Sequence, residues 1–155
     1  MEIKDFLRPG NVLVDLRAAD KRRLLQDIAA RAAAIVNVPA DRIASELMKR
    51  EALGSTGTGG GIAIPHARLP ELKKPFGMLM RLRQAIDFEA VDEKPVDIVF
   101  LLLAPAAAAG EQLNALACVA RKLRDPASVH ALRDAADGAA LYRAMTGTAT
   151  ELTRE

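Results

Sequence analysis

Apolar residues recur along the first part of the chain at spacings that change from strand-like to helical. The run from Asn11 to Leu16 mixes β-branched and aliphatic residues directly after Pro9-Gly10, which predicts a short strand. Asp20 then offers an N-cap, and the apolar residues after it predict one amphipathic helix that ends at about Asn37. The apolar face of this helix consists of Leu24, Leu25, Ile28, Ala29, Ala32, Ile35 and Val36.

A second helix is expected to begin after Pro39, at about Ala40. Ile43, Leu47 and Arg50 follow at i, i+4 and i+7, so Arg50 falls on nearly the same stripe as the apolar residues. The other charged residues near this end of the helix, Glu46, Lys49 and Glu51, are expected to point elsewhere. Because a cation on the buried side needs a compensating anion, Arg50 becomes a candidate for an anion site.

The segment that follows, Gly54 to Gly61, is predicted to be a loop. Five of its eight residues are glycine, and each glycine costs about 1 kcal/mol relative to alanine in a helix. The apolar run from Ile62 to Ile64 lies between this loop and Pro65, which predicts a short buried strand that carries His66 at its end.

The second half of the chain continues the alternation of strands and helices. Strands are predicted over Gly77 to Gln84 and Val96 to Leu103, the second of them central, and shorter helices over Pro126 to Ala136 and Ala139 to Met145. A longer helix is predicted over Gly110 to Leu123, with a buried stripe of Leu113, Leu116, Ala117, Ala120 and Leu123. The polar tail after Gly147 is expected to be frayed. This order favours an α/β fold in one domain, 1–155, with a core at about 9–147.

Composition excludes several classes of protein. The 155 residues carry 22 Lys and Arg against 20 Asp and Glu, and only 3% are aromatic, which disfavours a nucleic-acid binder. The most apolar stretch, Ile98 to Ala109, contains Pro105 and falls short of the roughly 20 residues that a membrane span needs. The first eight residues lack the apolar core of a signal peptide, and the single Cys118 favours a reducing compartment. We therefore expect a soluble, cytoplasmic protein without membrane insertion.

The glycine-rich loop has two interpretations from the residues alone. A nucleotide-binding loop follows a strand and opens a helix, whereas this loop follows a helix and precedes a strand, and it has no lysine in the phosphate-binding position. It is therefore either a flexible turn or, given the hydroxyls of Ser55, Thr56 and Thr58, a loop that contacts an oxyanion.

His66 is the strongest candidate for chemistry. A lone histidine is more often a surface or core residue, but a strand that ends in Pro-His beside a Gly/Ser/Thr loop presents an imidazole on a rigid support. Imidazole is nucleophilic near neutral pH and can accept a phosphoryl group without a metal, and no cluster with metal-ligand spacing is present. His130, the other histidine, is expected to be a surface residue.

Two further residues leave alternatives open. Arg50 is either an arginine whose stem packs on apolar surface or a clamp beside a phosphorylated His66. Glu111 and Gln112 open the Gly110 helix, where a solvated cap and an anion-binding helix terminus are both possible.

The stretch from Arg50 to His66, REALGSTGTGGGIAIPH, closely resembles the phosphorylation-site segment of enzyme IIA domains of the bacterial phosphoenolpyruvate-dependent phosphotransferase system, in the fructose/mannitol/nitrogen-regulatory class. The likeness covers roughly Pro9 to Gly147. It implies a central mixed β-sheet flanked by helices and no cofactor or metal. It also implies that an HPr-like carrier phosphorylates His66 as a tele-phosphohistidine, with Arg50 beside the histidine. The loop residues expected to contact the phosphate are Ser55, Thr56, Gly57 and Gly61.

The Gly-Ser-Thr-Gly loop on a standalone chain is most similar to the nitrogen-regulatory branch, which regulates potassium handling and metabolism by phosphorylation-dependent protein binding. A sugar-specific IIA that passes its phosphoryl group to a IIB protein, and a binding module that has lost phosphotransfer, are the alternatives. Members of the family usually have a second active-site histidine where this chain has Gln112, which remains a candidate site residue. An apolar rim for partner docking is expected from Ala67, Leu69 and Leu72.

Overall fold

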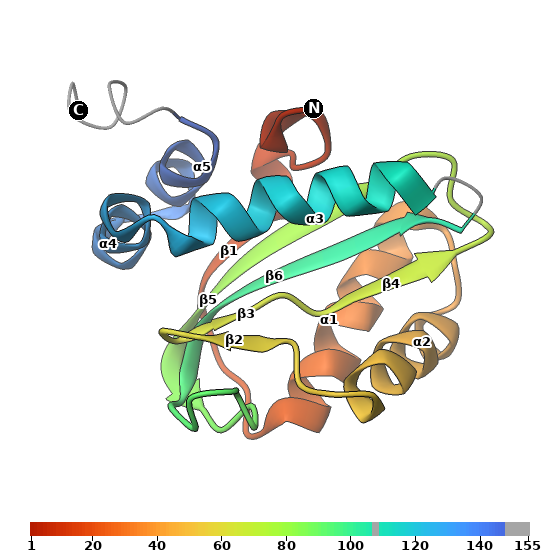
Figure 1. Ribbon diagram of the computed structural model, residues 1–155, viewed down its shortest axis with the longest axis horizontal. Coiled ribbons are helices and arrows are strands. Elements are labelled where there is room, and N and C mark those ends of the chain that lie inside the picture. Colours follow the sequence, from red (N-terminus) through yellow and green to blue (C-terminus); the bar gives the residue numbers. More distant parts are fainter. Residues whose placement is uncertain (107–108, 148–155) are drawn as a thin grey trace.

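The computed structural model describes residues 1–106 and 109–147 and consists of one mixed β-sheet with helices on both faces, as the resemblance implied (Figure 1). The expected fraying after Gly147 lies outside the described residues. The strands are β1 (Val12–Leu16), β2 (Gly57–Gly59), β3 (Ile62–Ala63), β4 (His66–Leu69), β5 (Phe76–Ile86) and β6 (Val96–Pro105). The α-helices are α1 (Lys21–Val36), α2 (Ala40–Ala52), α3 (Ala109–Arg124), α4 (Pro126–Asp134) and α5 (Gly138–Thr146). Two short 3-10 turns, η1 (Ile3–Asp5) and η2 (Pro9–Asn11), precede β1.

The sheet has the strand order β1-β5-β6-β3-β2, and β4 also pairs with β6. β1 runs parallel to β5, β5 runs antiparallel to β6, and both β3 and β4 run parallel to β6. The predicted central position of the Val96 strand is therefore confirmed. Ile98, Phe100 and Leu102 face one side of the sheet, whereas Val99 and Leu101 face the other, and all are fully buried. A strand buried on both faces reads as a continuous apolar run, which explains its sequence.

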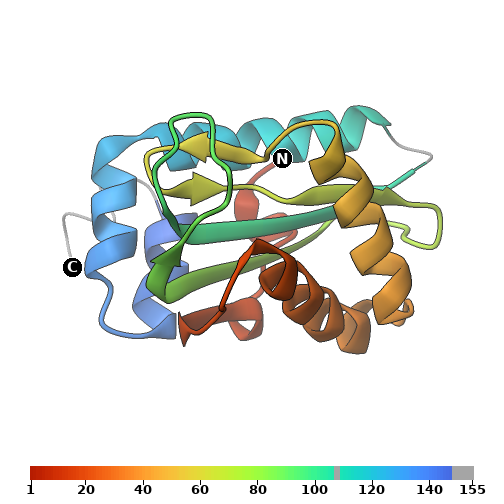
Figure 2. The ribbon, with the colours of Figure 1, turned by 90° about the horizontal axis from the view of Figure 1, so that it is seen from below.

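Each face of the sheet has its own layer of helices (Figure 2). α1 and α2 pack on one face, and α3, α4 and α5 pack on the other. Asp20 caps α1 as predicted, since its carboxylate accepts a hydrogen bond from the Arg23 N–H at 2.8 Å. Across the described ranges, no helix has both the length and the apolar composition that a membrane crossing requires.

The buried stripe predicted for α3 is wrong in part. Ala115, Val119 and Leu123 are buried, at i, i+4 and i+8, whereas Leu113 is 67% exposed and Ala117 is also exposed. The helix carries apolar residues around most of its circumference, so several stripes fit its sequence equally well. Packing against β6 and α4 selects the one that is buried.

The glycine-rich segment is not entirely a loop, because it contains β2. The two-residue turn between β2 and β3 consists of Gly60 and Gly61, with φ of 67° and 82°, and Gly59 pairs with Ile62 across it. A hairpin turn with two residues at positive φ favours glycine at both positions, because glycine has no Cβ to clash. The glycines therefore build a tight β-hairpin.

The apolar strand predicted at Ile62–Ile64 ends one residue earlier, and His66 begins the next strand instead of following the last residue of this one. Both strands lie along β6, where Ile62 pairs with Ile98 and His66 pairs with Leu102. Pro65, between them, accepts a hydrogen bond from the Leu102 N–H at 3.0 Å. The backbone of His66 is thus held on both sides by the central strand.

Candidate active site

His66 is the first residue of β4, and its pocket is lined by residues of α2 and by Gln112 of α3. Its Nδ1 is 2.8 Å from the carbonyl oxygen of Ile64, and its Nε2 is 3.3 Å from Nε of Arg50. A carbonyl can only accept and a guanidinium can only donate, so the proton belongs on Nδ1 and the lone pair on Nε2. The hydrogen bonds therefore select the neutral tautomer whose nucleophilic nitrogen is Nε2, the atom that becomes phosphorylated in a tele-phosphohistidine.

Burial lowers the pKa of His66 below its ordinary value of 6.5, because the partly buried ring loses the hydration of its charged form. The positive charge of Arg50 lowers the pKa further, whereas the hydrogen bond to Ile64 and the negative charge of Glu51 oppose the shift. The net direction keeps His66 neutral at physiological pH, with its Nε2 lone pair available for attack.

The ring of His66 is therefore expected to titrate with a midpoint below 6.5, which NMR of the imidazole protons as a function of pH measures. Since protons bind more readily to the unfolded chain, this histidine contributes stability that is lost as the pH falls from 6.5 through the folded midpoint. A midpoint at or above 6.5 would show that burial does not determine the titration of this ring.

Arg50 is held in the last turn of α2 by two contacts. Its Nη1 donates to the carbonyl oxygen of Gly54 at 2.8 Å, and its Nε faces His66. Gly54 has a φ of 151°, which directs this part of the chain back toward the end of the helix. The remaining N–H groups of the guanidinium form a planar donor set next to Nε2, suited to phosphoryl oxygens.

Arg50 was expected to have a neighbouring anion, but the buried carboxylate next to it in the chain, that of Glu51, pairs with Lys21. Glu51, which was predicted to point away from the core, is buried, and its carboxylate forms an ion pair with Nζ of Lys21 at 2.7 Å. It also accepts hydrogen bonds from the backbone N–H and the hydroxyl of Thr56. Glu51 follows Ile43 and Leu47 at i+8 and so continues the buried stripe of α2, where the loop covers it. The expectation that it points elsewhere was therefore wrong. Its partner Lys21 lies too far away in the chain for local spacing to indicate the pair.

The loop residues Ser55, Thr56 and Gly57 hold the loop in place. The Ser55 hydroxyl donates to the Phe88 carbonyl oxygen at 2.9 Å and accepts from the Gly57 N–H at 3.0 Å, and the Thr56 hydroxyl donates to Glu51. A Cβ on Gly57 would lie 2.8 Å from the Cβ of Ala90, so only glycine fits there. The predicted phosphate contacts of these residues remain predictions, and their present partners lie within the protein.

Gly61 lies away from His66, in the β2–β3 turn. Its carbonyl oxygen accepts from the Asp97 and Ile98 N–H groups at 3.0 and 3.1 Å, and an added Cβ would meet the guanidinium of Arg133 at 2.3 Å. Asp97 and Arg133 form an ion pair at 2.9 Å beside it. The structure therefore does not bring Gly61 together with the other predicted site residues.

The pocket at His66 has a volume of about 430 Å³ and brings together three of the predicted residues: His66, Arg50 and Gln112. Lys49 and Arg68 add positive charge to its lining, and Glu46 is its acidic member. Glu46 already pairs with Lys49 at 3.7 Å and with Arg42 at 3.9 Å. The pocket therefore presents a nucleophile, a guanidinium and a neutral amide in a positively charged setting that favours a phosphoryl group.

Of the apolar rim predicted next to His66, only Ala67 lines the pocket, and its side chain is almost fully buried. Leu69 is fully buried, because alternate residues of β4 face the core under α2, and Leu72 packs against the same core outside the pocket lining. The exposed apolar residues near the pocket are instead Leu53, which lines it and is 85% exposed, and Leu113, which follows Gln112.

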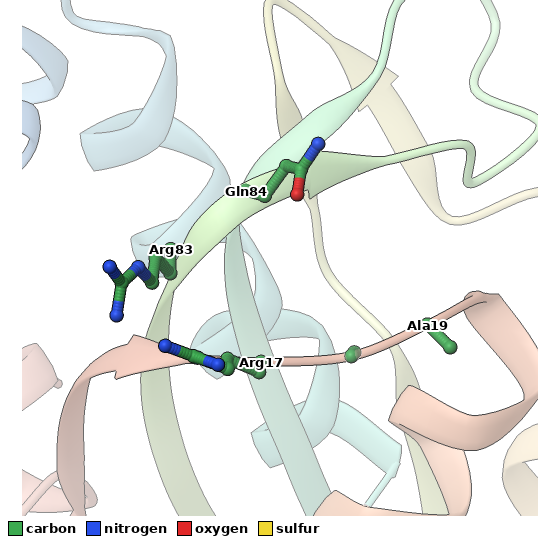
Figure 3. Close-up of a pocket in the computed structure, with 5 residues that line it drawn as sticks. Arg17, Ala19, Arg83 and Gln84 are labelled. Carbon is green, nitrogen blue, oxygen red and sulfur yellow. The ribbon is translucent and has the colours of Figure 1, made fainter.

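A larger cavity of about 630 Å³ lies at the end of β1, lined by Arg17, Ala18, Ala19, Arg83 and Gln84 (Figure 3). It contains no histidine, cysteine or carboxylate, so its lining offers no nucleophile or general base. Among the described residues, no three histidine, cysteine or carboxylate side chains gather as a metal site. The chemistry is therefore assigned to the smaller pocket, where the neutral imidazole lies.

A mixed sheet that supports a nucleophilic histidine beside an arginine defines a phosphoryl-accepting class of domain, and the chain belongs to the family described as "Phosphoenolpyruvate-dependent sugar phosphotransferase system, EIIA 2", which it matches over residues 5–147. Membership makes it a IIA-type phosphoryl-transfer component. It is 44% identical over 142 residues to a nitrogen regulatory protein of Bradyrhizobium diazoefficiens, which covers 92% of this chain and 93% of that protein.

Solved structures have the same fold. The nitrogen regulatory protein IIA-Ntr of Neisseria meningitidis superposes with a TM-score of 0.88 at 30% identity, over 93% of this chain and 99% of that one. The complex of IIA mannitol with phosphorylated IIB mannitol from Escherichia coli matches with a TM-score of 0.60 at 17% identity, over 96% of each chain. The second likeness establishes the fold alone.

Proposed function

We propose that this chain is a regulatory phosphocarrier, which accepts a phosphoryl group on Nε2 of His66 from a histidine of an HPr-like protein in the cytoplasm. The observation that carries the proposal is the neutral His66 ring, whose Nδ1–H is held by Ile64 while Nε2 faces Arg50. The proposed output is phosphorylation-dependent binding to proteins of nitrogen and potassium metabolism; the nitrogen part is in keeping with the names of the relatives, and the potassium part rests on the family resemblance alone.

The proposed step balances without a cofactor. The lone pair of Nε2 forms the new N–P bond as the donor's N–P bond breaks, and the electron pair returns to the donor imidazole. Arg50 then donates to phosphoryl oxygens in place of Nε2. The His66 ring gains positive charge because Nδ1 keeps its proton, and the Ile64 carbonyl oxygen and the nearby Glu51 carboxylate both favour that charge.

Intact-mass spectrometry after incubation with phosphoenolpyruvate, enzyme I and an HPr-like carrier tests the proposal. The wild type and His130→Ala are expected to gain one acid-labile phosphoryl group, and His66→Ala none. His130 is the matched control because it is the chain's other histidine and is exposed. An adduct that persists in His66→Ala, or that is absent from the wild type with an active carrier, would overturn the proposal.

A second candidate function is transfer to a IIB protein during sugar uptake. The family description names a sugar system, and one structural neighbour was solved with its phosphorylated IIB partner. The two candidates differ in the fate of the phosphoryl group. Incubation of the phosphorylated protein with IIB acceptors distinguishes them, since a regulatory carrier retains the group on that timescale whereas a sugar-specific IIA loses it.

Gln112 supplies a neutral amide where related proteins carry a second histidine, so the Gln112→His variant is expected to alter the stability of the phosphohistidine. A protonated histidine would form a charge-assisted hydrogen bond with the phosphoryl group, stronger than a neutral one by about 1 kcal/mol. We expect a phosphohistidine lifetime about fivefold longer at pH 6 and unchanged at pH 8, measured by intact mass over time. If the wild type and Gln112→His had equal phosphohistidine lifetimes at both pH values, the side chain at position 112 would have no effect on the phosphohistidine.

Leu53 is expected to be the main apolar contact for the donor protein, because transfer between two histidines requires the two surfaces to meet around His66. Leu53→Asp should raise the KM for the phosphorylated carrier about tenfold, with little change in kcat, since it removes apolar contact at the rim. Ile35→Asp, at another exposed apolar residue outside the pocket lining, is the control. Equal KM values for the two variants would refute this docking surface.

A further inference from the structure

A second groove lies apart from the His66 pocket and shares none of its lining residues. Its volume is about 730 Å³, and it is enclosed by the N-terminal segment, the end of α1, the β4–β5 connection and Tyr142 of α5. This volume falls within the range of about 300–1,000 Å³ that is typical of small-molecule sites. The proposed function does not use the groove.

The floor of the groove is apolar. Ile35 is 52% exposed there, one of the few large apolar side chains that the described residues leave exposed, and Val36, Leu72, Phe76 and Tyr142 are partly exposed beside it. Aliphatic and aromatic groups therefore face one cavity from three different parts of the chain. Such a concentration of exposed apolar surface favours an apolar ligand body.

The rim of the groove is positively charged. Arg8, Lys73 and Lys74 are exposed, and no hydrogen bond or ion pair joins their side chains to any residue that the structure describes. The lining holds two acids, Asp5 and Glu71, and Glu71 accepts from Nη2 of Arg42 at 3.0 Å. Lys4, Arg8, Lys73 and Lys74 outnumber these acids, so the net charge of the rim is positive.

The walls of the groove are held in position by the core. Phe6 is buried and packs edge-on against Phe100, with ring centroids 6.2 Å apart, and its carbonyl oxygen accepts from the Gly77 N–H at 2.8 Å. Gly77 permits this approach, since a Cβ there would lie 2.7 Å from the ring of Phe100. The N-terminal wall is thus fixed to the start of β5, and the groove is formed before any ligand arrives.

We propose that this groove binds a small amphipathic anion, an aliphatic or aromatic molecule with one carboxylate or phosphate head. The body lies over Ile35 and Phe76, and the head lies among Arg8, Lys73 and Lys74. The enclosed volume fits a small molecule, and the separation of apolar floor from cationic rim matches a ligand whose charge is at one end. The proposal is independent of phosphoryl transfer at His66.

Decanoate and decyl phosphate are suitable probes, with decanol as the uncharged comparison, and titrations followed by amide NMR locate the binding. Both anions are expected to shift signals of residues lining the groove, with decanol at least tenfold weaker and with affinity falling as salt rises. A preference between the two anions distinguishes the head groups. Absence of groove shifts at millimolar probe, or equal binding of decanol, would overturn the proposal.

Exposed positions allow variants that leave the core intact. The double variant Lys73→Glu/Lys74→Glu should weaken decanoate binding about tenfold, and Ile35→Asp should weaken both anions and decanol. Leu53→Asp, at the His66 pocket, is the matched control and should bind as the wild type does. Unchanged affinity in the groove variants would overturn the proposal, as would an acidic peptide that occupies the groove when decanoate does not. All groove variants should still gain the phosphoryl group, which separates this test from that of His66.

Discussion

Replacing Lys21 by methionine is expected to lower the free energy of unfolding by about 3–5 kcal/mol, because it leaves the carboxylate of Glu51 buried without its counter-ion. The side chains of Lys21 and Glu51 are 15% and 4% exposed, so water cannot replace the lost partner. Glu51 also lies in the last turn of α2, where the helix dipole disfavours a negative charge. Urea unfolding followed by circular dichroism measures the change.

Lys4→Met is the matched control, since Lys4 also pairs with a glutamate, at 3.4 Å, but both side chains are more than half exposed. Its expected cost is about 0–1 kcal/mol. The double variant Lys21→Met/Glu51→Leu should recover part of the loss, because no charge is then buried, although the Thr56 N–H loses its acceptor. A cost for Lys21→Met no larger than that for Lys4→Met would show that the pair is not required for the fold.

The Lys21–Glu51 ion pair connects the stability of the fold to the geometry of the His66 pocket. Thr56 is bound to Glu51, and Arg50, the neighbour of Glu51 in the chain, is bound to Gly54, so the end of α2 and the loop form one unit. Glu51 acts as a positioning residue, because it does not touch His66 and holds the segment that carries Arg50. A change at Lys21 or Glu51 is therefore expected to lower the phosphorylation rate even at temperatures where the variant is fully folded.

The parts of the fold that follow from local patterns were predictable from the sequence. The Asp20 cap, the apolar face of α1 from Leu24 to Ala32 and the continuous apolar run of β6 each depend on residues close together in the chain. Ile35, which was predicted on the same face of α1, is instead 52% exposed. His66 and Arg50 became candidates from local signals, a nucleophile after a strand and a cation on an apolar stripe, and their roles remain predictions. The position of Gln112 beside them came from the resemblance, and the fold brings the three together in one pocket.

The parts that depend on contacts distant in the chain were not predictable. The partner of Glu51 is Lys21, thirty residues earlier, so their ion pair does not follow from local spacing. Leu69 is buried because β4 lies under α2, whereas Leu53 is exposed at the end of α2. The composition of either segment alone does not indicate this packing. The hydroxyls of Ser55 and Thr56 bind Phe88 and Glu51, partners that the sequence did not indicate, and their contact with a phosphate remains a prediction. In each case the partner, and not the residue itself, determines the role.

Arg50→Gln is expected to slow phosphorylation of His66 by about 10²–10³-fold, the usual cost of removing a preorganised donor from a site where charge develops. The guanidinium is placed in advance by Gly54, and its N–H groups lie next to Nε2 of His66, the proposed acceptor atom. Arg50→Lys should recover only part of the rate, because a single ammonium cannot contact Gly54, Nε2 and the phosphoryl oxygens together. Rapid-quench measurement of single-turnover transfer from the phosphorylated carrier gives the rates.

Lys49→Gln is the control, since Lys49 lines the same pocket from the same helix but its ammonium pairs with Glu46. Its rate should fall only a few fold, through the weaker positive field. NMR titration separates the two functions of Arg50: because its charge lowers the pKa of His66, Arg50→Gln should raise the midpoint while slowing transfer. If Arg50→Gln and Lys49→Gln slowed transfer equally, the contribution of Arg50 would be its charge alone; a larger loss for Arg50→Gln assigns it a direct contact with the transferring group.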